Sequence, residues 1–283
     1  MTPKEAFDNG VAVITGAGSG IGEGLARCAA ALGMKVVLAD IAAERIERVA
    51  AEIKAAGGTA LPVPTDVTDR RAIEKLADVV HATFGDVRLL VNNAGIETIG
   101  YTWEIPAEVW DKILAINISG VVHGVRSFAP RMLQSGKQAY IANVASVGAL
   151  GMMPTQAPYM LSKHAVLSFT ECLFLEMQLM QKPVHVAAVL PGLVATRIFE
   201  DAPVDRESGF VERQRTHMKE MLAKGGLTSV EAGKIILEGI AAKQFWVSTH
   251  PEVTAHMAKG RADHLAGLKT PRLADEARSI LNS

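Results

Sequence analysis

The feature that most constrains the fold is a regular alternation of short apolar segments with segments of helical periodicity over the first third of the chain. Val11–Thr15 and Lys35–Asp40 are rich in β-branched or aliphatic residues, and each is followed by a helical pattern. Further strands are expected at residues 59–63 and 87–91, and helices at residues 42–56 and 69–84. This order predicts an α/β fold: a doubly wound parallel sheet with helices on both faces, in three α/β/α layers.

A glycine-rich turn follows the first expected strand. Gly16, Gly20 and Gly22 have the spacing Gly-x-x-x-Gly-x-Gly, with Ser19 and Ile21 between them. Glycines let such a turn tighten and let backbone N–H groups approach a pyrophosphate, which the N-terminus of the next helix stabilises. The turn therefore predicts a dinucleotide phosphate site, although its spacing differs from the more common Gly-x-Gly-x-x-Gly.

The second expected strand ends on an acidic residue, Asp40. A carboxylate at this point can accept hydrogen bonds from both hydroxyls of an adenosine ribose and would repel a 2′-phosphate. Neither Arg nor Lys lies in the glycine turn or directly after Asp40. We therefore predict NAD rather than NADP as the cofactor. The alternative is that Asp40 is a turn or N-cap residue, and it can serve both purposes.

Ser146, Tyr159 and Lys163 suggest acid/base chemistry on an alcohol or a carbonyl. Tyr159 and Lys163 are four residues apart on an expected helix and therefore share a face. A free tyrosine has a pKa of about 10, and a nearby lysine cation lowers it toward the working range. Ser146 ends an apolar strand and can hydrogen-bond a substrate oxygen. By itself, Tyr-x-x-x-Lys is also common as an ordinary surface pair.

Polar residues also follow the third and fourth expected strands. Asp66 and Val67 lie where an adenine would rest, and the Asn-Asn-Ala-Gly run at 92–95 leaves room for a cofactor. Asn and Gly are ordinary turn residues too. Asn117 interrupts the apolar middle of a helix that is expected from about residue 106 to beyond 120. A buried Asn needs partners, so it either makes structural hydrogen bonds or holds a water near the site.

Together these motifs resemble the short-chain dehydrogenase/reductase family, in its compact single-domain branch. The resemblance implies a Rossmann fold and an oxidoreductase that interconverts a secondary alcohol and a ketone by hydride transfer to or from NAD. Ala145 departs from the family pattern, which usually has a serine there. The matching positions, in order over roughly residues 9–200, are 15–22, Asp66, 92–95, Asn117, Ser146, Tyr159, Lys163, Pro191, Gly192 and Thr196.

The resemblance also implies a role for each catalytic residue. Tyr159 is the expected acid/base, and Ser146 positions the substrate oxygen. Lys163 binds the nicotinamide ribose and lowers the pKa of Tyr159. Asn117 kinks its helix and holds a water that relays protons to Lys163.

The expected cofactor site extends along the strand ends. By the same resemblance, Asn93 contacts the cofactor beside the nicotinamide ribose, while the backbone of Val194 and the hydroxyl of Thr196 hold the carboxamide. No metal site is expected. The complete set of expected cofactor-binding residues is Gly16, Ser19, Gly20, Ile21, Gly22, Asp40, Asp66, Val67, Asn93, Ala94, Gly95, Tyr159, Lys163, Pro191, Gly192, Val194 and Thr196.

The rest of the chain bears on domains and substrate. A single domain over residues 1–283 is expected, with a core at about 9–190, a substrate-binding lid at about 193–226 and a C-terminal tail at about 250–283 that forms a solvated or interface-packed helix. Met152 and Met153 either face the substrate pocket or fill the core. Neither Arg nor Lys is obviously placed to hold a substrate carboxylate or phosphate, so an apolar or aromatic secondary alcohol, or its ketone, is the expected substrate.

Composition and patterning bear on partners. The net charge of −1 and the absence of a Lys/Arg stripe argue against nucleic acid. Neither a signal region nor a long apolar run is present, so we expect a cytoplasmic protein without a membrane partner. Cys28 and Cys172 fall in expected helices and are predicted to be buried, reduced thiols. The helix over residues 158–180 is apolar nearly all round, which predicts a homo-oligomer, a dimer or the homotetramer common in the family.

Three other functions fit parts of the sequence. The first is an NADP-dependent carbonyl reductase of the same family. The second is an epimerase or dehydratase of the longer family branch, which usually reads Gly-x-x-Gly-x-x-Gly and has an added substrate domain. The third is a dinucleotide-binding regulator without catalysis, which the intact Ser146, Tyr159, Lys163 and Asn117 set argues against.

Overall fold

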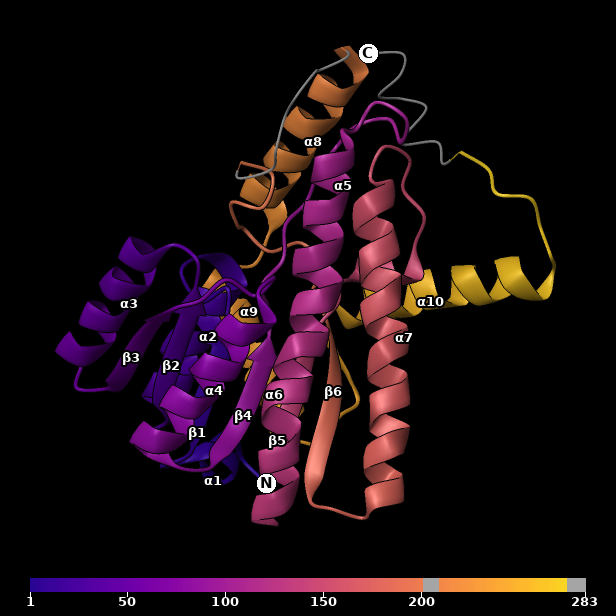
Figure 1. Ribbon diagram of the computed structural model, residues 1–283. Helices are drawn as coiled ribbons and strands as arrows, with labels where there is room; N and C mark the ends of the chain where they lie inside the picture. Colours follow the sequence, from indigo (N-terminus) through magenta and orange to yellow (C-terminus); the bar gives the residue numbers. More distant parts are fainter. Residues whose placement is uncertain (201–208, 274–283) are drawn as a thin grey trace.

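The computed structural model describes residues 1–200 and 209–273 (Figure 1). Its strands form one parallel sheet in the order β3-β2-β1-β4-β5-β6-β7. The chain winds outward from β1 in one direction and from β4 in the other, which confirms the doubly wound fold. The strands are β1 Val11–Thr15, β2 Lys35–Asp40, β3 Thr59–Pro64, β4 Val87–Asn92, β5 Ala139–Val144, β6 Val184–Leu190 and β7 Trp246–Ser248.

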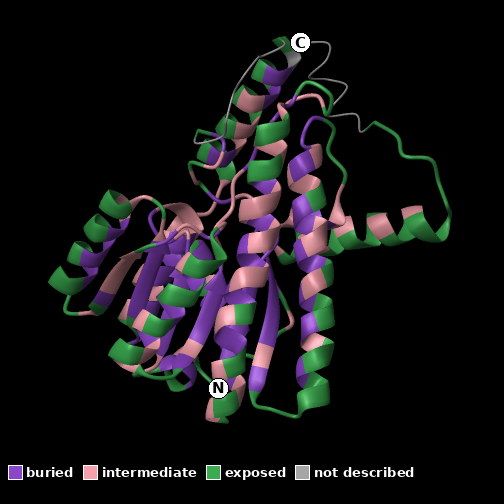
Figure 2. Cartoon of the chain, in the orientation of Figure 1, coloured by how far each residue is buried: buried purple, intermediate pink, exposed green. Residues whose placement is uncertain are grey.

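Helices cover both faces of the sheet, as the alternation predicts. One apolar cluster joins α2, α3 and α9 to one face, and a second joins α4, α6 and α7 to the other. Figure 2 shows the buried strands between these two helical layers. The helices are α1 Pro3–Phe7, α2 Gly20–Ala31, α3 Ala43–Ala55, α4 Arg70–Phe84, α5 Ala107–Leu114, α6 Gly120–Ser135, α7 Ala157–Met180, α8 Gly209–Gly225, α9 Ser229–Ala241 and α10 Pro251–Ala266, with a π-helical turn η1 Ala115–Ser119 and a 3-10 turn η2 Val147–Leu150.

Local signals account for several helix ends. The helix α3 stops before Gly57, whose φ of 83° lies in the left-handed region that favours glycine. The Asp69 side chain accepts the Arg71 N–H at 2.9 Å and caps α4. The helix α9 begins with a capping box in which Thr228 and Glu231 satisfy each other's backbone N–H groups. The Asp69 cap fixes where the chain turns from the end of β3 into α4.

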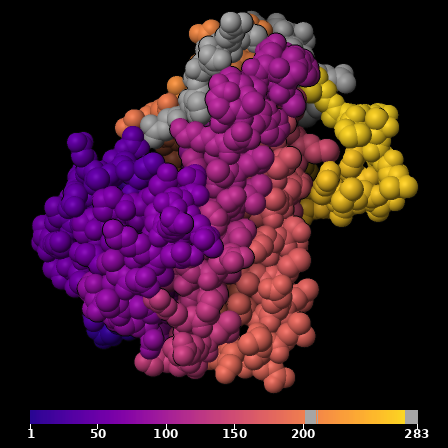
Figure 3. Space-filling model, in the orientation of Figure 1, coloured from indigo at the N-terminus to yellow at the C-terminus, as the bar shows by residue number. Residues whose placement is uncertain are grey.

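Two later helices lie beyond the carboxyl ends of the strands. The helix α8, within the expected lid, packs on a small apolar cluster made by Ile99, Phe199, Val211 and Leu222. The helix α10 has no buried residue. It packs against η2 and contributes Val253 and Met257 to the cavity, while its far end stands out from the body of the molecule (Figure 3). Residues 201–208 of the expected lid and 274–283 of the expected tail lie outside the described residues.

The prediction that both cysteines are buried is wrong for Cys172 and holds only in part for Cys28. Both cysteines are free and lie on helices, Cys28 on α2 and Cys172 on α7. Cys28 is half-buried, but Cys172 is exposed. Neither helical patterning nor hydrophobicity identifies the side of α7 that faces the sheet, because this helix is apolar nearly all round. Among the described residues, no helix is both long enough and apolar enough to span a membrane.

Candidate active site

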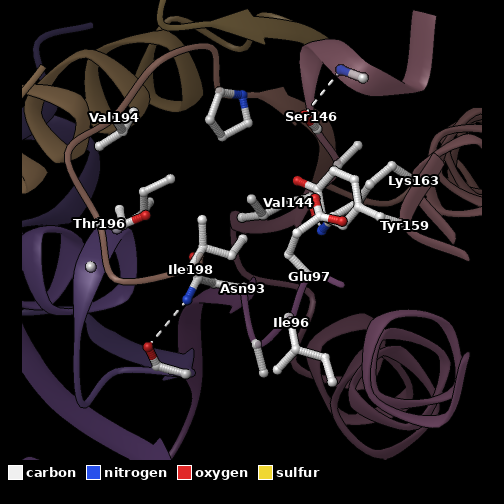
Figure 4. A pocket seen from close by; sticks show the side chains of 18 of the residues that line it. Asn93, Ile96, Glu97, Val144, Ser146, Tyr159, Lys163, Val194, Thr196 and Ile198 are labelled. Carbon is white, nitrogen blue, oxygen red and sulfur yellow. Dashed lines mark hydrogen bonds between the residues drawn. The ribbon is translucent and has the colours of Figure 1, made fainter. Parts of the chain in front are cut away.

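A cavity of about 790 Å³ opens at the carboxyl ends of the strands, where a fold of this type binds its ligands. It runs from the glycine turn after β1 to Tyr159 and Lys163 on α7, and the segment after β6 closes one side (Figure 4). Of the predicted site residues, all but Gly22 and Asn117 line it.

The glycine turn has the geometry of a cradle. Gly16 has a φ of 65°, and a Cβ atom there would lie 2.8 Å from the Cα of Ala94. A Cβ at Gly22 would lie 2.1 Å from the carbonyl oxygen of Gly16, so Gly22 serves the packing of α2 against the turn and not the cavity wall. Ser19 is the N-cap residue of α2, and its side chain makes no capping hydrogen bond. The turn therefore fits a pyrophosphate, which α2 would stabilise with its N-terminal N–H groups.

Asp40 lies at the edge of this glycine turn, and its carboxylate is hydrogen-bonded to backbone N–H groups. Its carboxylate accepts the N–H of Gly18 and the N–H of Ala42, each at 2.9 Å. Of the two roles expected for Asp40, cofactor contact and turn residue, the structural role as a turn residue is present. Arg45 also lines the cavity, next to Gly18. Arg45 lies early in α3, and this helix places it beside the glycine turn. Because Arg45 does not directly follow Asp40, the residues directly after Asp40 do not reveal it.

The residues after β4 tie the glycine turn to the catalytic side. The N–H of Asn93 donates to Thr15 Oγ1 at 2.9 Å, and its Nδ2 donates to the Thr15 carbonyl at 2.8 Å. At Gly95, a Cβ atom would lie 3.4 Å from Lys163 Nζ. Ala94, Asp66 and Val67 line the cavity here as well.

Ser146, Tyr159 and Lys163 meet at the catalytic end. Lys163 is 4% exposed, its Nζ donates to the Val144 carbonyl at 3.0 Å, and the same atom lies 5.5 Å from the centre of the Tyr159 ring. Ser146 Oγ accepts the Gly148 N–H at 3.0 Å, and its hydroxyl acts to lower the pKa of Tyr159. The helical spacing of Tyr159 and Lys163 thus places both on the side of α7 that faces the strand ends.

The expectation that Lys163 lowers the pKa of Tyr159 is not met, because that pKa is raised. Burial raises the pKa of Tyr159, the nearby Glu97 carboxylate raises it further, and the hydrogen bond with Ser146 acts in the opposite direction. Burial lowers the pKa of Lys163 to about 8, against the attraction of Glu97. Near that pH, Lys163 therefore carries less positive charge than an ordinary exposed lysine.

Asn117 occupies the π-helical turn between α5 and α6. Its Oδ1 accepts the Ile96 N–H and its Nδ2 donates to the Ile96 carbonyl, both at 2.9 Å. Nδ2 also donates to Ser162 Oγ at 3.0 Å. Of the two roles considered from the sequence, the side chain takes the structural one and fixes the loop after β4 against α7. The π turn interrupts the regular hydrogen bonds of the helix at the position where the kink is expected.

The segment after β6 closes the cavity on the far side. Thr196 approaches the glycine turn, since a Cβ at Gly20 would lie 3.1 Å from its methyl carbon. Gly192 donates its N–H to Thr249 Oγ1 at 3.0 Å. The two remaining predicted residues of this segment, Pro191 and Val194, also line the cavity, and Figure 4 shows Val194 there.

Several cavity residues are not among those predicted. Glu97, 2% exposed, accepts the Thr98 N–H at 3.0 Å, and burial raises the pKa of its carboxyl well above the ordinary range. Gln156 lines the cavity from the N-cap of α7, and His250 and Met257 line it from the segment after β7. The only sequence signal for Glu97 is an isolated acid directly after an otherwise small and apolar turn.

Met152 and Met153 are 52% and 40% exposed and line the cavity, so they do not fill the core. With Met160, Met218 and Met257 they give part of the cavity a flexible apolar wall. Among the described residues, no group of three or more His, Cys, Asp or Glu side chains is arranged to hold a metal ion.

A family model described as short chain dehydrogenase matches residues 10–207. The chain belongs to the short-chain dehydrogenase family. A solved structure of a family member from Burkholderia phymatum in complex with NAD is 35% identical and superposes with a TM-score of 0.91, covering 95% of this chain and 98% of that one. The fold and the family predicted from the sequence are thereby confirmed.

Relatives of this short-chain dehydrogenase differ in the fraction of their own length that the match covers. The C alpha-dehydrogenase of Sphingobium sp. (strain NBRC 103272 / SYK-6) is 30% identical over 259 residues, which is 89% of this chain and 84% of that protein. The Probable oxidoreductase EphD of Mycobacterium tuberculosis is 38% identical over 196 residues, 69% of this chain. The chain spans only about a third of the length of that protein, since the match covers 33% of it.

Proposed function

We propose that the protein is an NAD-dependent oxidoreductase that interconverts a secondary alcohol and a ketone. The observation that carries the proposal is the meeting of Ser146, Tyr159 and Lys163 at one end of a cavity whose other end is a glycine cradle. A cavity of this form holds a dinucleotide along its length and leaves its reactive end beside an acid/base pair.

The residues of this chain have distinct tasks in the proposed reaction. When bound, the dinucleotide supplies the hydride acceptor or donor. During reduction the protonated Tyr159 phenol donates its proton, and during oxidation the deprotonated form takes the hydroxyl proton, while Ser146 holds the substrate oxygen against Tyr159. Lys163 and Asn93 hold the ribose side of the cofactor, and Val194 and Thr196 hold its carboxamide. Correct orientation of the reacting groups contributes about 7–11 kcal/mol in favourable cases.

NAD is the proposed cofactor. The carboxylate of Asp40 lines the cavity beside the glycine turn, where it would oppose a 2′-phosphate. The relative from Burkholderia phymatum was solved with NAD. Arg45 favours the alternative, an NADP-dependent carbonyl reductase, because it lines the same part of the cavity and carries a guanidinium group. We give more weight to Asp40, since it lies directly at the strand end.

The proposed substrate has an apolar or aromatic body. Five methionines line the cavity, together with Ile198, Phe199 and Leu222. Methionine adapts its shape to varied apolar ligands, so the wall suits an uncharged substrate of moderate size.

We also propose a homo-oligomer built through the outer face of α7. Four large apolar side chains of this helix are exposed: Leu161, Leu175, Leu179 and Met180. Exposed apolar groups gathered on one helix are typical of a subunit interface. The predicted cytoplasmic location stays a prediction.

Turnover measurements test the proposed function. A panel of apolar and aromatic secondary alcohols is incubated with NAD or NADP, and reduced nicotinamide is followed by absorbance; the matching ketones are tested in reverse. We expect turnover with a kcat/KM for NAD at least about tenfold above that for NADP. Dinucleotide binding without turnover across the panel would favour the non-catalytic regulator instead.

A further inference from the structure

Two buried polar side chains in the wall of the cavity have no task in the proposed reaction. Glu97 is 2% exposed and Gln156 is 3% exposed, and both line the cavity. They belong to loops that are joined to each other, since the Gly100 N–H donates to the Thr155 carbonyl at 2.8 Å. Burial of a carboxyl and an amide within an apolar wall is costly unless both are hydrogen-bonded.

The amide of Gln156 is incompletely satisfied by the described part of the chain. Its Nε2 is buried and has no hydrogen-bond partner among the described residues. An unpaired buried donor costs about 1–3 kcal/mol. The Glu97 carboxyl accepts the Thr98 N–H, and a carboxyl group has capacity for further hydrogen bonds. Both groups therefore have unused hydrogen-bonding capacity.

These groups lie next to the reacting end of the cavity. Glu97 interacts electrostatically with both Tyr159 and Lys163, and Figure 4 shows its carboxyl directed toward that pair. Gln156 is the N-cap residue of α7, one turn before Tyr159. A substrate whose reacting oxygen meets Tyr159 would have its neighbouring carbon atom in the part of the cavity that Glu97 and Gln156 line.

We propose that Glu97 and Gln156 form a second polar subsite that binds a hydroxyl group on the carbon next to the reacting carbon. A hydroxyl can donate to the carboxyl and accept from the amide N–H at once, which satisfies both side chains. The substrate class is then a vicinal diol, or its α-hydroxy ketone, with an apolar body against the methionines. This assignment rests on the proposed function and narrows its substrate.

A hydroxyl-binding site discriminates against substrates that lack the hydroxyl, because its own polar groups are then left unpaired. If Glu97 acted only electrostatically, through Tyr159 and Lys163, its replacement would change kcat/KM for all substrates by the same factor. The two roles therefore differ in the ratio of rates for matched substrates.

The experiment compares 1-phenyl-1,2-ethanediol with 1-phenylethanol, and 2,3-butanediol with 2-butanol, each with NAD. We expect the wild-type kcat/KM for each diol to exceed that of its partner at least about tenfold. Glu97→Met and Gln156→Met, which keep the approximate side-chain length, should each lower this diol-to-monool ratio at least about tenfold. Glu97→Gln keeps an acceptor oxygen and should restore part of the ratio, while Glu104→Gln, an exposed position of the same loop, should leave it unchanged.

Equal wild-type values within both pairs would overturn the subsite, and so would a Glu97→Met variant that lowers both members of a pair by the same factor. In both cases the proposed function stands, because turnover is seen. If no alcohol of either pair reacts with NAD or NADP although NADH binds, the proposed function itself is contradicted, and the subsite with it.

Discussion

Asn117 satisfies both backbone polar groups of Ile96, accepting its N–H and donating to its carbonyl at 2.9 Å each. The π-helical turn at Ala115–Ser119 carries Asn117, and the loop that follows β4 carries Ile96. The same amide donates to Ser162 on α7. One buried side chain thus joins three segments that together shape the catalytic end of the cavity.

Replacing Asn117 with Leu should therefore destabilise the protein. Two partly buried backbone groups of Ile96 lose their partners, and each such loss costs about 1–3 kcal/mol where water cannot replace the partner. We expect a decrease in the free energy of unfolding of about 2–5 kcal/mol, measured by urea denaturation. The control is Gln134→Leu at an exposed position of α6. If Asn117→Leu is no less stable than this control, the joining role is wrong.

The sequence predicts the strand ends and the catalytic trio because these depend on local patterns. β-Branched runs mark the strands, and the four-residue spacing of Tyr159 and Lys163 puts both on one face of α7. Gly16 and Gly20 likewise have positive φ angles in the turn where glycines are expected.

Other features depend on packing between distant segments and have no local signal. Met257 reaches the cavity only because α10 folds back against η2 after the last strand. Glu97 is buried because the segments around it close over it. The pKa of Tyr159 is raised by the burial of its own side chain and, after that, by the charge of Glu97. A helix as evenly apolar as α7 does not reveal that Cys172 faces outward.

Asp40 should control the choice of cofactor. Asp40→Ser removes the charge that opposes a 2′-phosphate, and Arg45 then remains as a cation in the same region. We expect the ratio of kcat/KM for NADP to that for NAD to rise at least about tenfold, and to fall back in Asp40→Ser with Arg45→Ala. This ratio is independent of any general loss of stability from the Gly18 and Ala42 hydrogen bonds. An unchanged ratio would mean that Asp40 is only structural.

Glu97→Gln should make the protein more stable at neutral pH. Because burial raises the pKa of the Glu97 carboxyl in the folded state, the folded protein holds a proton that the unfolded chain releases near its ordinary pKa of 4.5. The free energy of unfolding of the wild type therefore falls as pH rises above that value. Glu97→Gln has no carboxyl at this position, so its free energy of unfolding does not fall for this reason. Unfolding curves at several pH values should show a gain for Glu97→Gln at pH 7 that disappears below pH 4.5. Glu104→Gln should show neither effect, and a Glu97→Gln variant less stable than wild type at pH 7 would refute the argument.

The exposed apolar side chains of α7 should hold subunits together. Leu175 and Leu179 are 58% and 83% exposed and one helical turn apart. Sedimentation equilibrium at micromolar protein should show an oligomer for the wild type and a smaller species for Leu175→Glu with Leu179→Glu. Leu268→Glu, at an exposed position after α10, should not change the mass. A wild-type protein that sediments only as a monomer would contradict the proposed interface.

The central claim is that the Tyr159 phenol handles the substrate proton. The most direct measurement compares the rate of NADH formation from a secondary alcohol by the wild type and by Tyr159→Phe, with the Kd for NADH measured in parallel by fluorescence. Loss of an acid/base group of this kind lowers the rate by about 10²–10⁴-fold, so we expect a decrease in that range with little change in the Kd. A Tyr159→Phe enzyme that turns over its alcohol at close to the wild-type rate would contradict the account.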